Sequence, residues 1–550
     1  MMRFWAWASK KQTTVGSAAT VLAFMVLLSR VLGLVRDRLL STYFAPEQLG
    51  VYFAAFRIPN VIFELLVMGA LTAAFIPVYT KYIAEEKHDD AKKLATVLIN
   101  LSVVILLLIA IPLYVAAPFF SRLLAPGFSP AQIAEMTAYT RFILLFQVAP
   151  LLIGNVLTGI LQSHSLFLIP AAAPVFYNVG IIIGTIALSS LWGLWGPVVG
   201  VGIGAFLFVA IQIPLIMKLG YRHTLAVDPK TPGVKEVGRL MGPRTLGLAI
   251  AQIDITVDLM LASLMGARMV TIFNFAQHLQ QLPVGLFGTT IAQAALPSLS
   301  QFSAKDNKHE FRETIQKGIH QILFWVLPAS VLFMVLRIPI VRLVFGASQF
   351  DWAATVDTGM TLSAFGLSLF AQAIIHILAR GFYALYDTKT PVRIGIITVI
   401  INSLLSAVFV LLMHLPVWSL GLSTSIASII NAAALLYLLD QRITALISRT
   451  LTVPAIKMAI AAGVTGVALY IPLKLLDQLV FDTTRTFGLL FLTGVSASLG
   501  LMTYFFLSWV LGVTQVYSIL RFTRKITALR GFSIEPAQEV VNGGISDKVS

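Results

Sequence analysis

The feature that most constrains this chain is a succession of long apolar stretches separated by short polar ones. Hydrophobic residues make up 58% of the 550 residues and charged residues only 11%, whereas soluble domains carry about 25% charged residues. A membrane-spanning helix needs about 20 mostly apolar residues. Fourteen stretches meet this length: 16–44, 49–79, 94–121, 134–162, 167–190, 193–217, 238–264, 269–298, 317–345, 355–384, 392–414, 418–439, 453–475 and 486–515. Because the alternating pattern of barrel strands is missing, we predict an all-α polytopic membrane protein and exclude a soluble enzyme.

The basic residues are distributed unevenly between the two sides of these predicted spans. The chain has 39 Lys and Arg against 24 Asp and Glu, a net charge of +15. With the N-terminus in the cytoplasm, 27 of the 39 fall in the N-terminal segment, the even-numbered loops and the C-terminal tail. Six fall in the opposite loops, and six lie inside predicted helices. Since Lys and Arg concentrate on the cytoplasmic side, both termini are predicted to be cytoplasmic, and the basic excess indicates topology rather than nucleic-acid binding.

The chain repeats itself at an offset of about 220 residues. Segment 51–77 aligns with segment 271–297, and identical residues recur at equivalent points: Phe53 and Phe273, Ala74 and Ala294, Pro77 and Pro297. Six predicted helices separate equivalent points, and an even number means that both halves enter the membrane in the same direction. The repeat therefore predicts two parallel six-helix lobes with two further helices. Parallel repeats are typical of transporters that handle substrate between the lobes.

No part of the predicted organisation carries a catalytic motif. Its parts are a cytoplasmic segment (1–15), an N-lobe (16–217), a cytoplasmic loop (218–237), a C-lobe (238–439), two more helices (440–515) and a cytoplasmic tail (516–550). A Walker loop, a dinucleotide-binding glycine pattern and an HExxH motif are all missing from the sequence. The chain also has no cysteine, so disulfides and thiolate metal sites are excluded. These observations predict a transporter without a bound cofactor or structural metal, and not an enzyme.

Charged residues inside the apolar layer are the candidate binding residues of the N-lobe. A charge there costs at least about 2.5–3.5 kcal/mol, so it normally faces a partner or a cavity. The first predicted helix carries Arg30 near mid-depth and Arg36 and Asp37 nearer its outer end, and the second brings Arg57 to a similar depth, with Glu64 beyond it. Three arginines against two carboxylates leave a positive surplus. We predict a cationic cavity that accepts an anionic group through forked guanidinium bonds; alternatively, the arginines only neutralise the carboxylates.

The C-lobe carries candidate residues of a different kind. Asp254 and Asp258 are four residues apart, as are Asn402 and Ser406, so each pair lies on one face of its helix. Carboxylate, amide and hydroxyl oxygens suit a small hard cation or a proton. The alternative is hydrogen-bonded packing between helices. The sequence thus leaves open Na⁺ or H⁺ coupling at this place.

Several runs of the sequence resemble the MurJ/MviN family. They are SRVLGLVRD (29–37), FRIPN (56–60), MGALTAAFIPVY (68–79), LPSLS (296–300) and, most specific, GFYALYDTKTPV (381–392). The resemblance covers essentially the whole chain. It implies the fold of the multidrug/oligosaccharidyl-lipid/polysaccharide (MOP) exporter superfamily. It also implies flipping of lipid II, the undecaprenyl-pyrophosphate-linked peptidoglycan precursor, across the bacterial inner membrane by alternating access.

The resemblance also implies site residues. Carried over position by position, it implies a substrate site formed by Ser29, Arg30, Arg36, Asp37 and Arg57. A sodium site known in some family members is compatible with Asp258, Asn402 and Ser406. The sequence departs from the family pattern at five positions where a charged residue is usual: Gly50, Phe63, Met68, Gln277 and His278.

These departures leave other functions open. One is export of a different polyprenyl-linked glycan. A second, export of a drug-like cation, conflicts with the arginines of the N-lobe. A third is a scaffold that transports nothing and recruits other cell-wall synthesis proteins in the membrane.

Overall fold

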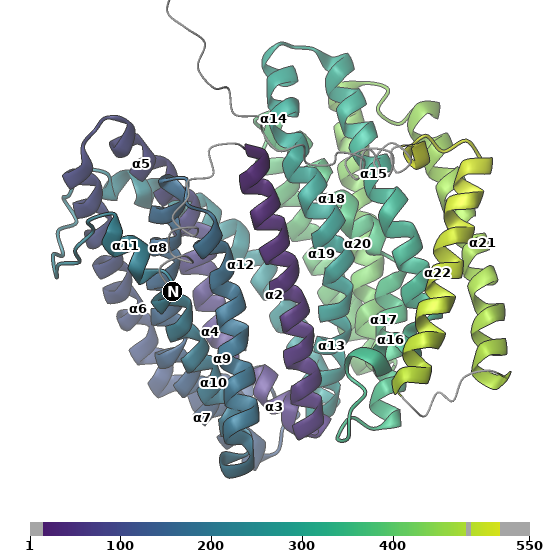
Figure 1. The fold of residues 1–550 in the computed structure, drawn as a ribbon, viewed down its shortest axis with the longest axis horizontal. Helices are drawn as coiled ribbons and strands as arrows, with labels where there is room; N and C mark the ends of the chain where they lie inside the picture. The colour runs from purple at the N-terminus through teal and green to yellow at the C-terminus, as the bar shows by residue number, and fades with distance from the viewer. Residues whose placement is uncertain (1–14, 480–485, 518–550) are drawn as a thin grey trace, which may run out of the picture.

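The molecule is a bundle of helices (Figure 1). The computed structural model describes residues 15–479 and 486–517, and every regular element in these ranges is a helix. Eleven described segments are long and apolar enough to cross a membrane, and the bent pair α17 (Trp352–Gly366) and α18 (Leu369–Ala384) would be a twelfth. This confirms the predicted all-helical polytopic membrane protein. The count of fourteen stays a prediction, because it also needs the charge-bearing helices α2 (Val15–Tyr43) and α12 (Val234–Leu264) to span the membrane.

The N-terminal half consists of α2 and the ten segments that follow it. They are α3 (Pro46–Ala55), α4 (Arg57–Phe63), the π-helical η1 (Glu64–Leu71), α5 (Thr72–Ala84), α6 (His88–Leu124), α7 (Pro130–Phe146), α8 (Val148–Ser163), α9 (Leu168–Trp192), α10 (Trp195–Ala210) and α11 (Ile213–Lys218). In Figure 1, α2 runs along the line where this half meets the other.

The C-terminal half begins with α12, and two helices are added after it. The segments after α12 are α13 (Ala267–Pro283), the π-helical η2 (Val284–Thr289), α14 (Thr290–Ala304), α15 (Lys308–Val335), α16 (Arg337–Val344), α17, α18, α19 (Lys389–Ala407), the π-helical η3 (Val408–Leu412) and α20 (Trp418–Ile443). The added helices, α21 (Arg449–Leu479) and α22 (Thr486–Val510), lie at the edge of the bundle (Figure 1). The predicted spans 49–79 and 355–384 are each divided here; the second bends by 45°.

The two halves repeat the same irregularities, which confirms the internal repeat. The π-helical turns begin at Glu64 and Val284, 220 residues apart. The next turn has a left-handed residue in each half, Glu86 (φ 60°) and Asp306 (φ 50°), again 220 apart. Matching π-turns and matching strained turns are features of the backbone, so they show a structural repeat even where sequence identity is low.

The two halves pack against each other mainly at one end of the bundle. We call it the predicted outer end: the end at which α2 finishes at Tyr43, which the basic residues assign to the periplasm. One apolar core there contains residues of both halves, among them Leu40, Phe53, Phe275 and Phe345. Toward the other end there are two separate cores: one lies within the C-terminal half, and the other joins the N-terminal half to the start of α12 through Val234 and Val237. The halves are therefore joined at the predicted outer end around a space that lies between them.

Candidate functional site

A cavity of about 650 Å³ lies between the two halves. The N-terminal half contributes two arginines, one carboxylate and several amides and aromatic rings, while α13 contributes four polar side chains. Its polar lining residues include Arg36, Arg57, Glu64, Tyr177, Gln252, Asn274, Gln277, His278 and Gln281. Two of the arginines named from the sequence, Arg36 and Arg57, line this cavity, but its lining comes from both halves and not from the N-lobe alone.

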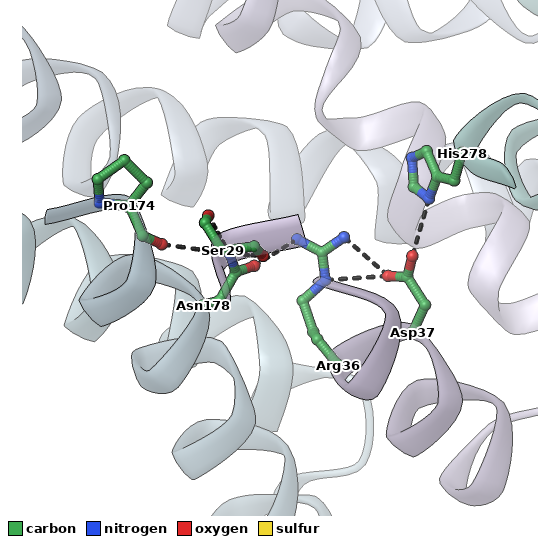
Figure 2. A network of polar contacts seen from close by, with 6 residues as sticks. All are labelled: Ser29, Arg36, Asp37, Pro174, Asn178 and His278. Atoms are coloured by element: carbon green, nitrogen blue, oxygen red, sulfur yellow. Dashed lines mark hydrogen bonds and ion pairs between the residues drawn. The ribbon is translucent and has the colours of Figure 1, made fainter. Parts of the chain in front are cut away.

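Arg36 holds the centre of a hydrogen-bond network on one wall (Figure 2). Its Nε and Nη2 donate to Asp37 Oδ1 at 2.9 and 2.7 Å, and its Nη1 donates to Asn178 Oδ1 at 3.1 Å. Asn178 in turn donates to the hydroxyl and main-chain oxygens of Ser29, each at 3.3 Å. The network joins α2 to α9. A guanidinium has five N–H donors, so these three bonds leave two free at a side chain that lines the cavity.

Asp37 connects this network to the opposite half. Its side chain is only 1% exposed, and its second oxygen, Oδ2, lies 2.8 Å from His278 Nδ1 on α13 (Figure 2). A buried carboxylate needs compensation by charge and hydrogen bonds, and Asp37 receives it from one residue of each half. Asp37 is therefore placed to orient Arg36 and to join the halves, rather than to face a ligand.

Arg57 crosses the cavity wall from the N-terminal half to α12. Its Nε donates to Thr256 Oγ1 at 2.9 Å, and its Nη2 donates to the side-chain oxygen of Gln252 at 2.8 Å and to that residue's main-chain oxygen. Both hydrogens of Arg57 Nη1 lack a partner among the residues that the structure describes. Glu64 also lines the cavity but forms no ion pair with Arg57 within the described ranges. The alternative that the arginines merely neutralise Asp37 and Glu64 thus applies to Arg36 in part, while Arg57 and Glu64 interact through their charges without forming an ion pair.

Arg30 lies apart from the cavity lining. Its guanidinium approaches Gly285 of η2 so closely that a side-chain carbon added to that glycine would stand 2.6 Å from Arg30 Nη2. Within the described ranges it makes no hydrogen bond or ion pair. The glycine leaves room for the guanidinium against the C-terminal half. Arg30 and Arg36, which the sequence assigned to one site, are therefore separated in this conformation, because they point to different sides of α2.

Sequence reasoning missed Asn178, the residue that links Ser29 to Arg36. An amide within the otherwise apolar predicted span 167–190 is the signal that could have identified it, since polar residues at membrane depth usually have a partner. Gln252, an amide within the predicted span 238–264, was also missed and carries the same signal.

The four predicted cation-site residues meet between α12 and α19. Asn402 Nδ2 donates to Asp254 Oδ1 at 2.9 Å, and Asp258 lies beside Asn402 and Ser406. Ser406 shares a hydrogen bond of 2.6 Å with Ser423 of α20. Asp258 Oδ1 and Asn402 Oδ1 are buried without a hydrogen-bond partner. Two unpartnered acceptors on neighbouring side chains are the kind of oxygen that a cation or a proton would satisfy.

The relationship to known proteins agrees with this geometry. A family model described as lipid II flippase MurJ matches residues 40–490. The chain belongs to the MurJ family. This is a family of transporters and not of catalytic enzymes, as the sequence predicted.

Individual relatives of the MurJ family extend the similarity over most of the chain. The probable lipid II flippase MurJ of Vibrio cholerae is 31% identical over 431 residues, which cover 76% of this chain and 81% of that protein. The lipid II flippase MurJ of Burkholderia cenocepacia is 29% identical over 428 residues, covering 76% and 82%.

Solved structures share the fold. A MurJ lipid II flippase in an inward closed conformation superposes with a TM-score of 0.74 at 24% identity, covering 89% of this chain and 98% of that one. An inward-facing MATE multidrug transporter of the MOP superfamily superposes with a TM-score of 0.66 at 16% identity, covering 76% and 95%. The fold of this MurJ family member is thus that of the MOP superfamily.

Four of the five departures from the MurJ family pattern can be placed. Phe63, Gln277 and His278 all line the cavity, and His278 bonds to Asp37. Gly50 lies elsewhere, where α3 meets α13. The side chain of Met68 lies outside the described residues. Three of the departures therefore alter the cavity wall, while the Asp37–His278 contact keeps a polar link between the halves.

Side chains close the predicted outer end of this MurJ family member. Arg268 donates to Glu47 at 3.0 Å and also to Asp351, and Arg38 donates to the main-chain oxygen of Leu343 at 2.7 Å. The hydrogen bond from Arg268 holds the pKa of the Asp351 carboxyl below its ordinary value. The Arg268–Asp351 ion pair therefore contributes to stability at neutral pH, and this contribution is lost as the pH falls through the lowered pKa of Asp351. Exposed ion pairs contribute only about 0–1 kcal/mol each, so these polar contacts add little to the apolar core that joins the halves at this end.

Proposed function

We propose that this protein is a lipid II flippase of the bacterial inner membrane, with both termini in the cytoplasm. The observation that carries the proposal is the pair Arg36 and Arg57. Both line one inter-half cavity, and each keeps two uncommitted N–H donors there. A pyrophosphate is a polyanion whose phosphate groups each present oxygen atoms that forked donors bind in pairs. Membership of the MurJ family supports lipid II as the lipid that carries this pyrophosphate.

The other predicted site residues take supporting roles in this proposal. Asp37 and Ser29 orient Arg36 through the network of Figure 2. Arg30 lies against Gly285 of the C-terminal half, so a movement between the halves would change its contacts. Transport would proceed by alternating access. The two separate cores toward the cytoplasm and the weak polar contacts between the halves at the predicted outer end support opening to one side at a time.

A transport measurement tests the proposal. Purified protein in liposomes that contain lipid II is expected to expose lipid II headgroups to a membrane-impermeant reagent faster than protein-free liposomes do. Other polyprenyl-linked glycans, tested in parallel, are expected to respond less. If another polyprenyl-linked glycan gives an equal or larger response, lipid II is not the preferred substrate. Neither binding nor transport of any of these lipids would favour the scaffold and contradict the flippase.

We further propose that Asp258 and Asn402 hold the coupling cation, with Asp254 and Ser406 completing the site. The unpartnered buried oxygens of Asp258 and Asn402 support this cation site.

The Na⁺ dependence of transport tests the cation site. If Na⁺ is the ion, Asp258→Asn should raise the Na⁺ concentration needed for half-maximal lipid II transport by about tenfold or more. The reason is that a charged hard ligand is replaced by a neutral one. Asp306→Asn, which changes an exposed loop carboxylate, should behave as the unaltered protein. If a proton gradient rather than Na⁺ stimulates transport, and Asp258→Asn removes that stimulation, H⁺ is the ion. Equal responses of both variants would contradict the site.

A further inference from the structure

A second cavity, of about 660 Å³, lies at the predicted outer end and shares no lining residue with the inter-half cavity. It is lined by the end of α15, by α16 and α17, and by the two added helices α21 and α22. Three cationic side chains line it: Arg337, Arg342 and Lys474. An adjoining hollow of about 280 Å³ shares Arg342, Trp352 and Leu489 with it. We call the two together the outer pocket.

The cations of the outer pocket lack counter-charges. Among the described residues, no carboxylate lines it, and none of its three cations forms an ion pair. Arg337 donates from Nη1 to the main-chain oxygen of Met334 at 2.9 Å, but its Nε is buried without a partner. Arg342 lies over the ring of Trp352, with its guanidinium carbon 5.7 Å from the ring centre. Three cations in one partly buried pocket repel one another unless an anion joins them.

Snorkelling of the arginines to water is the simpler explanation for basic residues at the edge of a membrane. It predicts guanidinium groups whose donors all reach solvent. The buried, unpartnered Nε of Arg337 does not fit that prediction, because a donor removed from both water and protein acceptors costs free energy. A bound acceptor would remove this cost.

The walls of the outer pocket indicate what carries the anion. Leu473, Leu489 and Leu492 make part of the wall apolar. Trp352 and Tyr470, which also line it, are of the kind that lies at the level of lipid headgroups. A site with cations, apolar walls and interfacial aromatic rings suits the phosphate and the adjoining chain of a lipid better than a free phosphate ion.

We propose that the outer pocket binds a lipid-borne phosphate of net negative charge. Arg337 and Arg342 donate to its oxygens, and the apolar wall formed by α21 and α22 contacts its chain. An anionic phospholipid and a polyprenyl pyrophosphate both carry this chemistry, and the experiment distinguishes the two sources. The site is separate from the inter-half cavity, so its test does not depend on the proposed flippase function.

Native mass spectrometry of the purified full-length protein tests the outer pocket. The probes are phosphatidylglycerol, undecaprenyl pyrophosphate, zwitterionic phosphatidylethanolamine and inorganic phosphate. We expect phosphatidylglycerol, undecaprenyl pyrophosphate or both to bind more tightly than the other two probes, and the tighter of these two names the source. Because a charge-assisted hydrogen bond contributes about 1.5–3 kcal/mol, the double variant Arg337→Gln/Arg342→Gln should weaken that binding by about tenfold or more.

Control variants separate this effect from general loss of charge or of fold. Arg122→Gln removes an exposed arginine on the same predicted side and should bind the lipids normally. Lys474→Gln changes an exposed side chain that lines the pocket, so it should weaken binding even if the double variant does not fold. The proposal is overturned if the anionic lipids bind no better than phosphatidylethanolamine, if inorganic phosphate competes equally well, or if Arg122→Gln weakens binding as much as the pocket variants.

Discussion

Replacing Arg36 with alanine is expected to abolish growth of a bacterium that depends on this protein as its only lipid II flippase. The change removes both bonds from Arg36 to Asp37, which is only 1% exposed, and the bond to Asn178. Removing one partner of a buried ion pair costs about 3–5 kcal/mol, which corresponds to more than about a hundredfold in an equilibrium constant. It also removes the two donors left free toward the cavity. Complementation, the amount of protein in the membrane and lipid II binding are the measurements.

Two further variants make the Arg36 result specific. Arg141→Ala removes another arginine of a predicted span, one that donates to the main-chain oxygen of Tyr114 and stacks on its ring outside the cavity lining, and it should leave growth normal. Arg36→Lys keeps the charge but loses the fork, so we expect partial growth. Normal growth of the Arg36→Ala strain with a normal amount of protein would show that the cavity arginines do not bind the substrate.

Substituting alanine at Gly50 is expected to hold the predicted outer end open and to slow transport. A side-chain carbon at Gly50 would lie 1.8 Å from the main-chain oxygen of Ala267 and 2.5 Å from its carbonyl carbon. Because those atoms belong to the backbone of α13, they can move only if α3 and α13 separate. Overpacking of this kind costs about 1–3 kcal/mol, which would lower the ratio of closed to open protein roughly five- to hundredfold.

Cross-linking measures this closure directly. The chain has no cysteine, so a pair introduced by Thr42→Cys and Ser348→Cys would be the only one; Ser348 donates to the main-chain oxygen of Thr42 at 2.9 Å in the closed end. The pair should cross-link readily with Gly50 present and poorly after Gly50→Ala. Gly33→Ala is the matched control, since a side chain there would meet nothing within 4 Å. Unchanged cross-linking in the Gly50→Ala protein would contradict this account of the closure.

The sequence was sufficient for much of the fold because the relevant signals are local or repeat along the chain. Apolar length predicted the helices, and the recurrence of Phe53 at Phe273 predicted the two-fold organisation that the π-turns at Glu64 and Val284 confirm. The predicted segment boundaries are local assignments that the structure does not test. Where one predicted span became several segments, as at 49–79, hydropathy alone did not reveal the breaks, because all the segments are apolar.

The candidate site was predictable only in part. The cost of charge in the apolar layer identified Arg36 and Arg57, and both line the cavity. The same argument applied equally to Arg30, which the structure places against Gly285 instead. The free-energy cost of a charge in the apolar layer shows that the charge needs a partner, but it does not show which residue that partner is.

The sequence alone established the class of molecule and its helical character, because apolar length and charge are properties of neighbouring residues. It also established the internal repeat, because similar residues recur in the same order about 220 positions apart. Only the tertiary structure decided which polar side chains meet. Arg36 finds Asn178, 142 residues away, and Asp37 finds His278, 241 residues away. Such contacts depend on how each helix is rotated and how far it is shifted against its neighbours. That arrangement is set by the packing of all the helices together, so no single stretch of sequence carries it.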